Sequence, residues 1–311
     1  MGVIAISAEQ VRDAVSMPEA IAAVRQAFID LVAGDFEMPV RTALRDGQFL
    51  DMAAHHRPSG TAMFKTLSLN FDGRDPAIAG TVVWSDLETS DVLVADAVAV
   101  TALRTGAASG VATDLMAPAD ARRCVVIGTG AQAADQVRSV RAVRPIDHVT
   151  LVGRDRARAD ALATALAGEL GDATVEVVLD VDAALAVADV VCCATTAQEP
   201  LFSVDALPEQ VHVNAIGSFR PTMRELPDEL LAGGLVVIDD RAAILEESGE
   251  ILHALAAGAI TADSLLELGA ALTEGIDRTP RTSFKSVGVA VQDWAVARLL
   301  AARFLDQRTD R

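Results

Sequence analysis

The sequence predicts an α/β protein that combines a doubly wound parallel sheet with a second domain of the α+β class. After Pro118, short apolar strands alternate with helical stretches, which is typical of a parallel sheet with crossover helices. Residues 40–94 instead have the sequence pattern of β-strands, with HRPSG and FDGRDP as turns. A chain of 311 residues favours two domains, which we expect at residues 1–115 with 287–311 and at residues 116–286.

The first domain is expected to begin with a short strand, VIAIS, and two helices. The first helix begins at Ser7, and Ser16 caps the second, which carries Pro18 in its first turn. Strands follow in FLDMAA, AMFKTLSLNF and GTVVWSD, and the last of these forms a hairpin with VLVAD over residues 80–96. An Ala-rich helix over residues 97–114 completes this part.

The second domain is expected to start with the strand CVVIG, a Gly-rich turn and a helix. Further strands lie in HVTLVGR, VEVVLD, DVVCCAT, VHVNAIG and LVVIDD, separated by helical stretches. A last helix over residues 286–305 returns to the first domain.

Composition and charge exclude several classes of protein. The shares of hydrophobic residues (51%) and charged residues (23%) are typical of a globular protein rather than a disordered one. A formal charge of -18 repels polyanions, so nucleic acid is not an expected partner. No apolar run reaches the roughly 18 residues of a membrane span, and the N-terminus does not resemble a signal peptide. Three cysteines in apolar runs favour a cytoplasmic protein with reduced thiols and no metal site.

A Gly-rich turn after the strand CVVIG indicates dinucleotide binding. Gly128 allows the tight turn, Gly130 lets the backbone approach a pyrophosphate, and the small Ala133 lets helix and strand pack closely. The pyrophosphate would then lie at the N-terminus of the following helix, where free N–H groups and the helix dipole favour an anion. Because strand, turn, helix and next strand are all in place, we expect a Rossmann-type domain.

The residues after the next strand favour NADP(H) over NAD(H). NAD-binding proteins commonly carry an acidic residue there, whereas this sequence has Gly153 and Arg154. A carboxylate would repel a 2′-phosphate, and an arginine would bind it. Asp155 leaves NAD open, because a shift of one residue would bring its carboxylate to the ribose.

Two further strand ends are expected to meet the cofactor at the carboxyl edge of the sheet. Thr195 and Thr196 follow DVVCC, and Ile216 and Gly217 follow VHVNA. The other residues expected to contact the cofactor are Thr105, Ala131, Gln132 and Ser286.

Three cations lie in apolar surroundings in the first half of the chain, namely Arg41, Lys65 and Arg104. Isolated buried cations are costly unless they are paired, so these surroundings suggest a bound anion. The alternative is that each is an ordinary side chain whose charged end reaches solvent.

With the turn GTGAQA and the segments NAIGSFRP and FKSVGVAVQDWAVA, these cations make the chain resemble the ornithine cyclodeaminase/mu-crystallin family. The resemblance covers essentially the whole chain in the right order. It implies a homodimer whose first domains associate through their sheets, and a substrate site between the two domains. It also implies that Arg41, Lys65 and Arg104 hold the carboxylate of an amino or imino acid, and that Lys65 can shuttle a proton.

Phe219 distinguishes between branches of that family. In the cyclodeaminase branch an aspartate lies two residues after the glycine that corresponds to Gly217, where it handles the substrate amine and water. Phe219 occupies this position here, and an aromatic ring can neither accept a proton nor fix an ammonium by a charge-assisted hydrogen bond. The pattern resembles the ketimine reductases, which include mu-crystallin and bacterial Δ1-pyrroline-2-carboxylate reductases.

The resemblance therefore implies an oxidoreductase that transfers a hydride from NADPH to the C=N bond of a cyclic ketimine. Δ1-pyrroline-2-carboxylate or Δ1-piperideine-2-carboxylate would give proline or pipecolate. The cation cluster would orient the substrate, and Phe219 would shape its pocket. Lys65, an ordered water or a substrate that arrives as the iminium could supply the proton, and the sequence leaves this open.

Three alternatives stay open. An alanine-type amino-acid dehydrogenase would use the same carboxylate clamp but release ammonia. An ornithine cyclodeaminase with tightly held NAD is disfavoured by Phe219. A protein of a different class would bind NADPH and a small carboxylate-bearing ligand without turnover.

Overall fold

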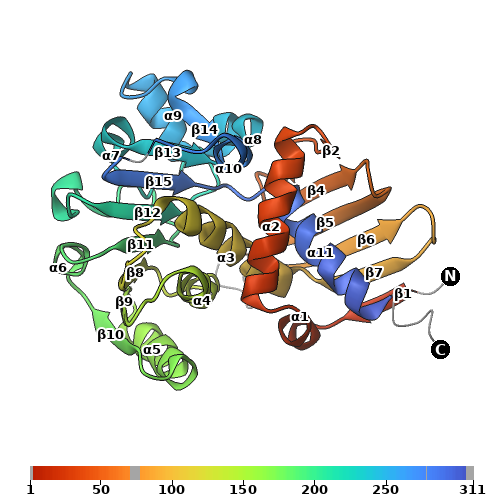
Figure 1. The fold of residues 1–311 in the computed structure, drawn as a ribbon, viewed down its shortest axis with the longest axis horizontal. Coiled ribbons are helices and arrows are strands. Elements are labelled where there is room, and N and C mark those ends of the chain that lie inside the picture. The colour runs from red at the N-terminus through yellow and green to blue at the C-terminus, as the bar shows by residue number, and fades with distance from the viewer. Residues whose placement is uncertain (1–2, 71–77, 278, 306–311) are drawn as a thin grey trace. The chain divides into compact units, whose positions relative to one another are not determined.

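A computed structural model describes residues 3–70, 78–277 and 279–305. The chain divides into two compact units, residues 1–108 with 289–311 and residues 109–288, and the division falls within helix α3 (Ala97–Met116). The expected turn FDGRDP lies outside the described residues. Figure 1 labels the elements of both units.

The first unit contains a mixed sheet of seven strands. Its order is β1 (Val3–Ile6), β7 (Val92–Asp96), β6 (Ile78–Asp86), β5 (Thr61–Leu69), β4 (Phe49–His56) and β2 (Phe36–Glu37), and β3 (Thr42–Leu44) also pairs with β4. The β1–β7 pair is parallel and the other pairs are antiparallel, so the predicted hairpin of residues 80–96 is confirmed.

Helices cover one face of this sheet. Helices α2 (Met17–Val32) and α11 (Ala290–Phe304) lie side by side across it, and α1 (Ala8–Ala14) follows β1 (Figure 1). Ser7, where the first helix was predicted to begin, and the predicted cap Ser16 both form capping boxes, with Gln10 and Glu19. Side chains alternate along β5, so Lys65 lies on the helix-covered face, whereas Phe64 on the opposite face is 53% exposed.

The second unit is a doubly wound sheet of eight parallel strands, as the sequence predicts. Its order is β10 (Thr174–Val178), β9 (His148–Val152), β8 (Arg123–Ile127), β11 (Val190–Cys193), β12 (Val211–Ala215), β15 (Arg281–Lys285), β13 (Leu235–Ile238) and β14 (Leu265–Glu267). The strand order reverses direction between β8 and β11, and ligands of such sheets bind beside this switch point.

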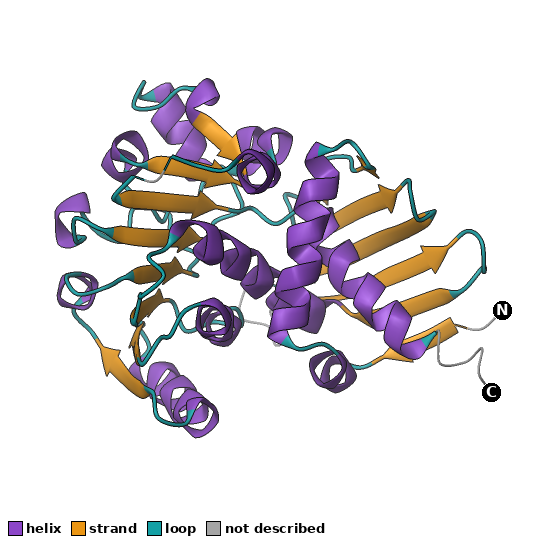
Figure 2. Cartoon of the chain, viewed as in Figure 1, coloured by secondary structure: helices purple, strands orange, loops and turns teal. Residues whose placement is uncertain are grey.

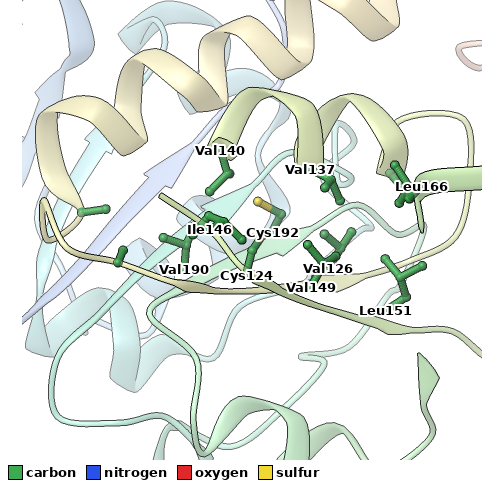
Figure 3. Close-up of a cluster of buried hydrophobic side chains, with 13 residues drawn as sticks. Cys124, Val126, Val137, Val140, Ile146, Val149, Leu151, Leu166, Val190 and Cys192 are labelled. Carbon is green, nitrogen blue, oxygen red and sulfur yellow. The ribbon is translucent and has the colours of Figure 1, made fainter. Parts of the chain in front are cut away.

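Helices lie on both faces of this sheet (Figure 2). They are α4 (Ala133–Val143), α5 (Arg156–Leu170), α6 (Val181–Leu185), α7 (Asp228–Gly233), α8 (Arg241–Glu247), α9 (Gly249–Ala256) and α10 (Leu268–Glu274), with short 3-10 helices at Val204–Ala206 and Ala262–Ser264. Figure 3 shows Val137 and Val140 of α4 packed over Cys124 and Cys192 of the central strands. This core anchors the first turn of α4 against β8.

Four strands were not predicted as such, namely β2, β3, β14 and β15, and the last helix begins later than predicted. Residues 281–285 form the buried strand β15, and α11 begins at Ala290 rather than at Ser286. The sequence RTSFK has one large apolar residue, so it lacks the apolar run expected of a central strand. The polar side chains of β15 are instead satisfied inside the sheet, for example Thr282 by His212 at 2.9 Å. The edge strand β14 has only three residues, too few for a periodic signal.

Candidate active site

A buried cluster of charged side chains lies under the sheet of the first unit. The Lys65 ammonium donates to Asp293 Oδ1 at 2.8 Å, and Arg104 Nε lies 3.3 Å from the same oxygen. Arg104 also donates to the side-chain oxygen of Gln292. Strand β5 supplies Lys65, α3 supplies Arg104 and α11 supplies Asp293, so three elements distant in sequence converge here.

The charge of this cluster is unbalanced. The side chains of Lys65 and Asp293 have no exposed surface and that of Arg104 is 6% exposed, so two cations share one carboxylate away from water. Within the described residues, Asp293 Oδ2 and Arg104 Nε have no hydrogen-bond partner. Buried charges are stable only when paired, so this excess of positive charge favours a bound anion.

Burial also changes the acidity of Lys65. Desolvation lowers the pKa of its ammonium to about 8, while Asp293 acts in the opposite direction. Arg104 and Arg41 lower the pKa further, which places Arg41 near enough to act on Lys65. The three cations named from the sequence therefore belong to one electrostatic group.

The Gly-rich turn after β8 fits a dinucleotide. Gly128 has a φ of 113°, and a Cβ there would lie 2.3 Å from the Ala194 carbonyl oxygen, so only glycine is tolerated. A Cβ at Gly130 would meet no described atom within 4 Å, which leaves the turn open for close approach by a ligand. Ala131 and Gln132 form the turn that leads into α4, where Ala133 is fully buried.

The segment after β9 has only one carboxylate before α5, and that carboxylate has a structural partner. Asp155 caps α5 by accepting from the Arg158 backbone N–H at 3.1 Å. Arg154 is exposed, and a Cβ at Gly153 would lie 2.7 Å from the Thr129 side chain. The strand end thus presents an arginine and has no room for an acidic side chain at residue 153.

Apart from Thr105, the remaining residues that were expected to contact the cofactor follow strands at the same carboxyl edge of the sheet. Thr195 and Thr196 follow β11, Ile216 and Gly217 follow β12, and Ser286 follows β15. Ser286 donates to the buried carboxylate of Asp239 at 2.7 Å, which also accepts from the backbone of residues 287 and 288. Thr105 is buried in α3 beside Arg104, in the first unit.

The neighbouring residues Phe219 and Ser218 differ in burial and in their contacts. Phe219 is half-buried, and the Arg220 guanidinium lies 5.5 Å from its ring centroid. The Ser218 hydroxyl is fully buried and donates to Glu250 at 2.6 Å, so it is occupied inside the unit.

Sequence reasoning missed several buried charged residues. Asp293 lies beside the polar Gln292 in the apolar segment VGVAVQDWAVA, Glu225 lies in the loop before α7, and Glu250 lies in the first turn of α9. A polar pair inside an apolar helix is the same signal that identified Lys65, and it could have identified Asp293. Glu225 lies in a loop among other acidic residues, where no pattern distinguishes it.

The described residues contain neither a candidate metal-binding cluster nor a helix that could span a membrane. No group of three or more His, Cys, Asp or Glu side chains in this part of the chain is arranged to hold a metal ion. No described helix has both the length and the apolar character required to cross a bilayer.

The fold is that of the Rossmann-type dinucleotide-binding proteins, with a second α+β unit. Residues 3–308 match the ornithine cyclodeaminase/mu-crystallin family, and the chain belongs to this family. It is 34% identical to a Δ1-pyrroline-2-carboxylate reductase of Bacillus cereus over 97% of both chains.

Solved structures resemble it over nearly the whole chain. Thermococcus litoralis Δ1-pyrroline-2-carboxylate reductase, in complex with NADH and L-proline, has a TM-score of 0.91 and 28% identity over 98% of each chain. An archaeal alanine dehydrogenase dimer with bound NAD has a TM-score of 0.90 and 27% identity, covering 99% of this chain and 98% of that one.

Proposed function

We propose that this protein is an NAD(P)H-dependent reductase of cyclic ketimines that converts Δ1-pyrroline-2-carboxylate or Δ1-piperideine-2-carboxylate to proline or pipecolate. The observation that carries the proposal is the buried group of Lys65, Arg104 and Asp293, in which a substrate carboxylate would supply the missing negative charge. The names of the Bacillus and Thermococcus relatives support the same substrate class.

Each residue of the proposed carboxylate site has a role that follows from its chemistry. Arg41 and Arg104 offer planar, bidentate donors to the carboxylate, which orients the ring and its C=N bond. Lys65, with a pKa of about 8, is largely protonated at neutral pH and is suited to give a proton to the ring nitrogen. Asp293 Oδ2 is an available acceptor for the N–H of the protonated imine. A bound nicotinamide dinucleotide would supply the hydride.

Phe219 supports a reductase over a cyclodeaminase. Its ring carries no acid or base, and the neighbouring Ser218 hydroxyl is bonded to Glu250. An alanine-type dehydrogenase is the second candidate, favoured by the archaeal alanine dehydrogenase with the same fold. An alanine-type dehydrogenase would need the same cations to bind its substrate carboxylate. A test of substrates, rather than the residues described, therefore distinguishes the two enzymes.

NADPH is the favoured cofactor. The names of the two structural neighbours support a nicotinamide dinucleotide in general, since one holds NADH and the other NAD. The preference for the 2′-phosphate rests on this chain's own residues. Arg154 is exposed beside the strand end, and the Asp155 carboxylate is engaged as a helix cap.

A homodimer formed through the open sheet face is part of the proposal. Leu44, Phe49 and Phe64 on that side of the first unit are 52%, 44% and 53% exposed, and Phe64 borders a cavity of about 290 Å³. Exposed apolar patches of this kind mark interfaces, and the archaeal neighbour is a dimer.

The three described cysteines are buried and unpaired, which supports a cytoplasmic location.

The test is the loss of NADPH absorbance with each of the two cyclic ketimines, beside NADH and beside the variant Lys65→Ala. We expect turnover with preference for NADPH, and at least a hundredfold loss of kcat/KM in the variant, about 3 kcal/mol. Arg25→Ala, on α2 of the same unit, is the matched control for removing a cation.

Other outcomes assign other functions. Ammonia-dependent turnover of pyruvate without turnover of the ketimines would identify an amino-acid dehydrogenase. Release of ammonia from ornithine without net change in NADPH would identify a cyclodeaminase. Tight NADPH binding without turnover of any of these substrates would indicate a binding protein and refute the proposal.

A further inference from the structure

A buried carboxylate in the second unit joins two of the loops named as cofactor-binding. Glu225 Oε1 accepts from the Thr195 backbone N–H at 2.6 Å and from its hydroxyl at 2.9 Å. Oε2 accepts from the N–H groups of Gly217 at 2.8 Å and Ser218 at 3.2 Å. One side chain therefore holds the loop after β11 and the loop after β12 together.

The donors around Glu225 favour an ionised carboxylate. Each oxygen accepts from at least one backbone N–H group, which can only donate, and Oε1 also accepts from the Thr195 hydroxyl. Burial and the neighbouring Glu250 carboxylate raise the pKa of Glu225 above its ordinary value, although Lys285 and the Thr195 hydrogen bonds act in the opposite direction. The Glu225 side chain is fully buried, so these protein donors are what hold its carboxylate.

A second layer of charge holds Glu225 in place. Its backbone N–H donates to Glu250 Oε1 at 2.9 Å, and Glu250 also accepts from the Ser218 hydroxyl. Lys285, at the end of β15, donates to the Ser218 carbonyl oxygen at 2.6 Å and lies 3.5 Å from Glu250. Three adjacent strands thus contribute to one network at the carboxyl edge of the sheet.

The loop after β11 is in close backbone contact with the Gly-rich turn on one side and with the loop after β12 on the other. A Cβ at Gly128 would lie 2.3 Å from the Ala194 carbonyl oxygen, and a Cβ at Gly217 would lie 2.2 Å from the Thr195 nitrogen. A displacement of the loop at residues 194–196 would therefore be transmitted to Gly128 on one side and to Gly217 on the other.

We infer that Glu225 is a positioning residue that fixes the loops after β11 and β12 in the conformation that binds the nicotinamide dinucleotide. The inference deepens the proposed function, because it assumes that these loops hold the cofactor. Its role differs from that of Lys65: Glu225 is saturated by backbone donors and acts on the ligand only through the two loops.

The test compares Glu225→Gln with the control Glu246→Gln, which changes an exposed carboxyl on α8 of the same unit. The amide of glutamine cannot accept at its nitrogen, so one loop loses its acceptor. We expect the Kd for NADPH, measured by fluorescence titration without substrate, to rise at least tenfold. Hydrogen exchange should accelerate in residues 194–197 and 216–218 but not in the core strands β8 and β12.

A second variant tests the reach of the side chain. Glu225→Asp keeps the charge but is one methylene shorter, so it can hold only one of the two loops. We expect it to free one loop in hydrogen exchange and to give a Kd between those of the wild type and Glu225→Gln. If Glu225→Gln does not fold, Glu225→Asp by itself tests whether Glu225 positions the two loops.

Three results would overturn the inference. The first is an unchanged Kd in the folded variants, the second is continued protection of both loops, and the third is a loss of protection spread evenly over the unit. Because cofactor binding is measured without substrate, failure of the ketimine assay in the wild type would refute the proposed function and leave this test intact.

Discussion

Replacing Asp293 by asparagine should shift the pH dependence of turnover towards acid. Among the described residues, Asp293 is the one carboxylate paired with Lys65, at 2.8 Å, and it raises the pKa of the ammonium. Burial and two arginines lower this pKa from 10.5 to about 8, a cost of about 3 kcal/mol for the charged form. If the protonated Lys65 is the active form, turnover of the wild type should fall as the pH rises through about 8.

The size of the shift follows from the loss of one opposite charge in a dry site. A carboxylate at this range typically changes a pKa by about 1–3 units, so Asp293→Asn should bring the pKa of Lys65 to roughly 5–7. With a pKa near 6, the protonated fraction at pH 7 would fall from about nine-tenths to about one-tenth. We therefore expect about a tenfold loss of kcat at pH 7, recovered in large part near pH 5.

The assay is the pH profile of kcat for NADPH-dependent ketimine reduction. Asp13→Asn, which changes an exposed carboxylate on α1, is the matched control and should keep the wild-type profile. Asp293→Glu keeps the charge and should keep the basic limb of the profile near that of the wild type. A profile of Asp293→Asn that falls by the same factor at every pH, or that superimposes on the wild type, would refute the reasoning.

Three further predictions concern cofactor, assembly and stability. Arg154→Ala should raise the KM for NADPH about tenfold to a hundredfold while leaving that for NADH within twofold, since a charge-assisted bond contributes about 1.5–3 kcal/mol; equal changes for both cofactors would contradict this. Phe64→Glu should convert a dimer to a monomer in light scattering, because it places charges on the apolar sheet face; an unchanged mass would exclude that face as the interface. Burial lowers the pKa of His212 to about 4, so the unfolded chain binds a proton between pH 6.5 and 4 that the folded chain does not. Stability should therefore fall by about 2 kcal/mol from pH 7 to pH 5 through this residue, and urea titrations of His212→Gln should show a correspondingly smaller decrease.

The sequence was informative where a pattern repeats and uninformative where a contact is unique. The β8–turn–α4 unit could be predicted because the glycines, the apolar strand and the following helix are consecutive in the chain. Strand β15 could not, because its polar residues are satisfied by neighbours such as His212 that lie 70 residues away. The spacing of apolar residues shows which side chains face an apolar core. The polar side chains of β15 are buried against polar partners, so this spacing does not reveal the strand.

The cation cluster shows the same limit at the level of the site. Lys65 and Arg104 were identifiable because each charge interrupts an apolar stretch. Their pairing with Asp293 depends on α11 returning to the sheet from far along the chain, since Arg104 and Gln292 are 188 residues apart. No local pattern encodes that approach, so a bound anion could be inferred from the sequence but the pairing of the two cations with Asp293 could not.

Buried charge alone does not indicate a ligand, and the two units show what does. The cluster of Lys65, Arg104 and Asp293 has a net positive charge and two buried polar atoms without a partner among the described residues. Glu225 is equally buried, yet all four of its contacts are donors from the protein itself. A substrate can bond to buried polar atoms that have no partner in the protein, whereas a carboxylate whose oxygens are all bonded to loops holds those loops in place. By this criterion we propose the first cluster as the substrate site and the second as the device that positions the loops proposed to receive the cofactor.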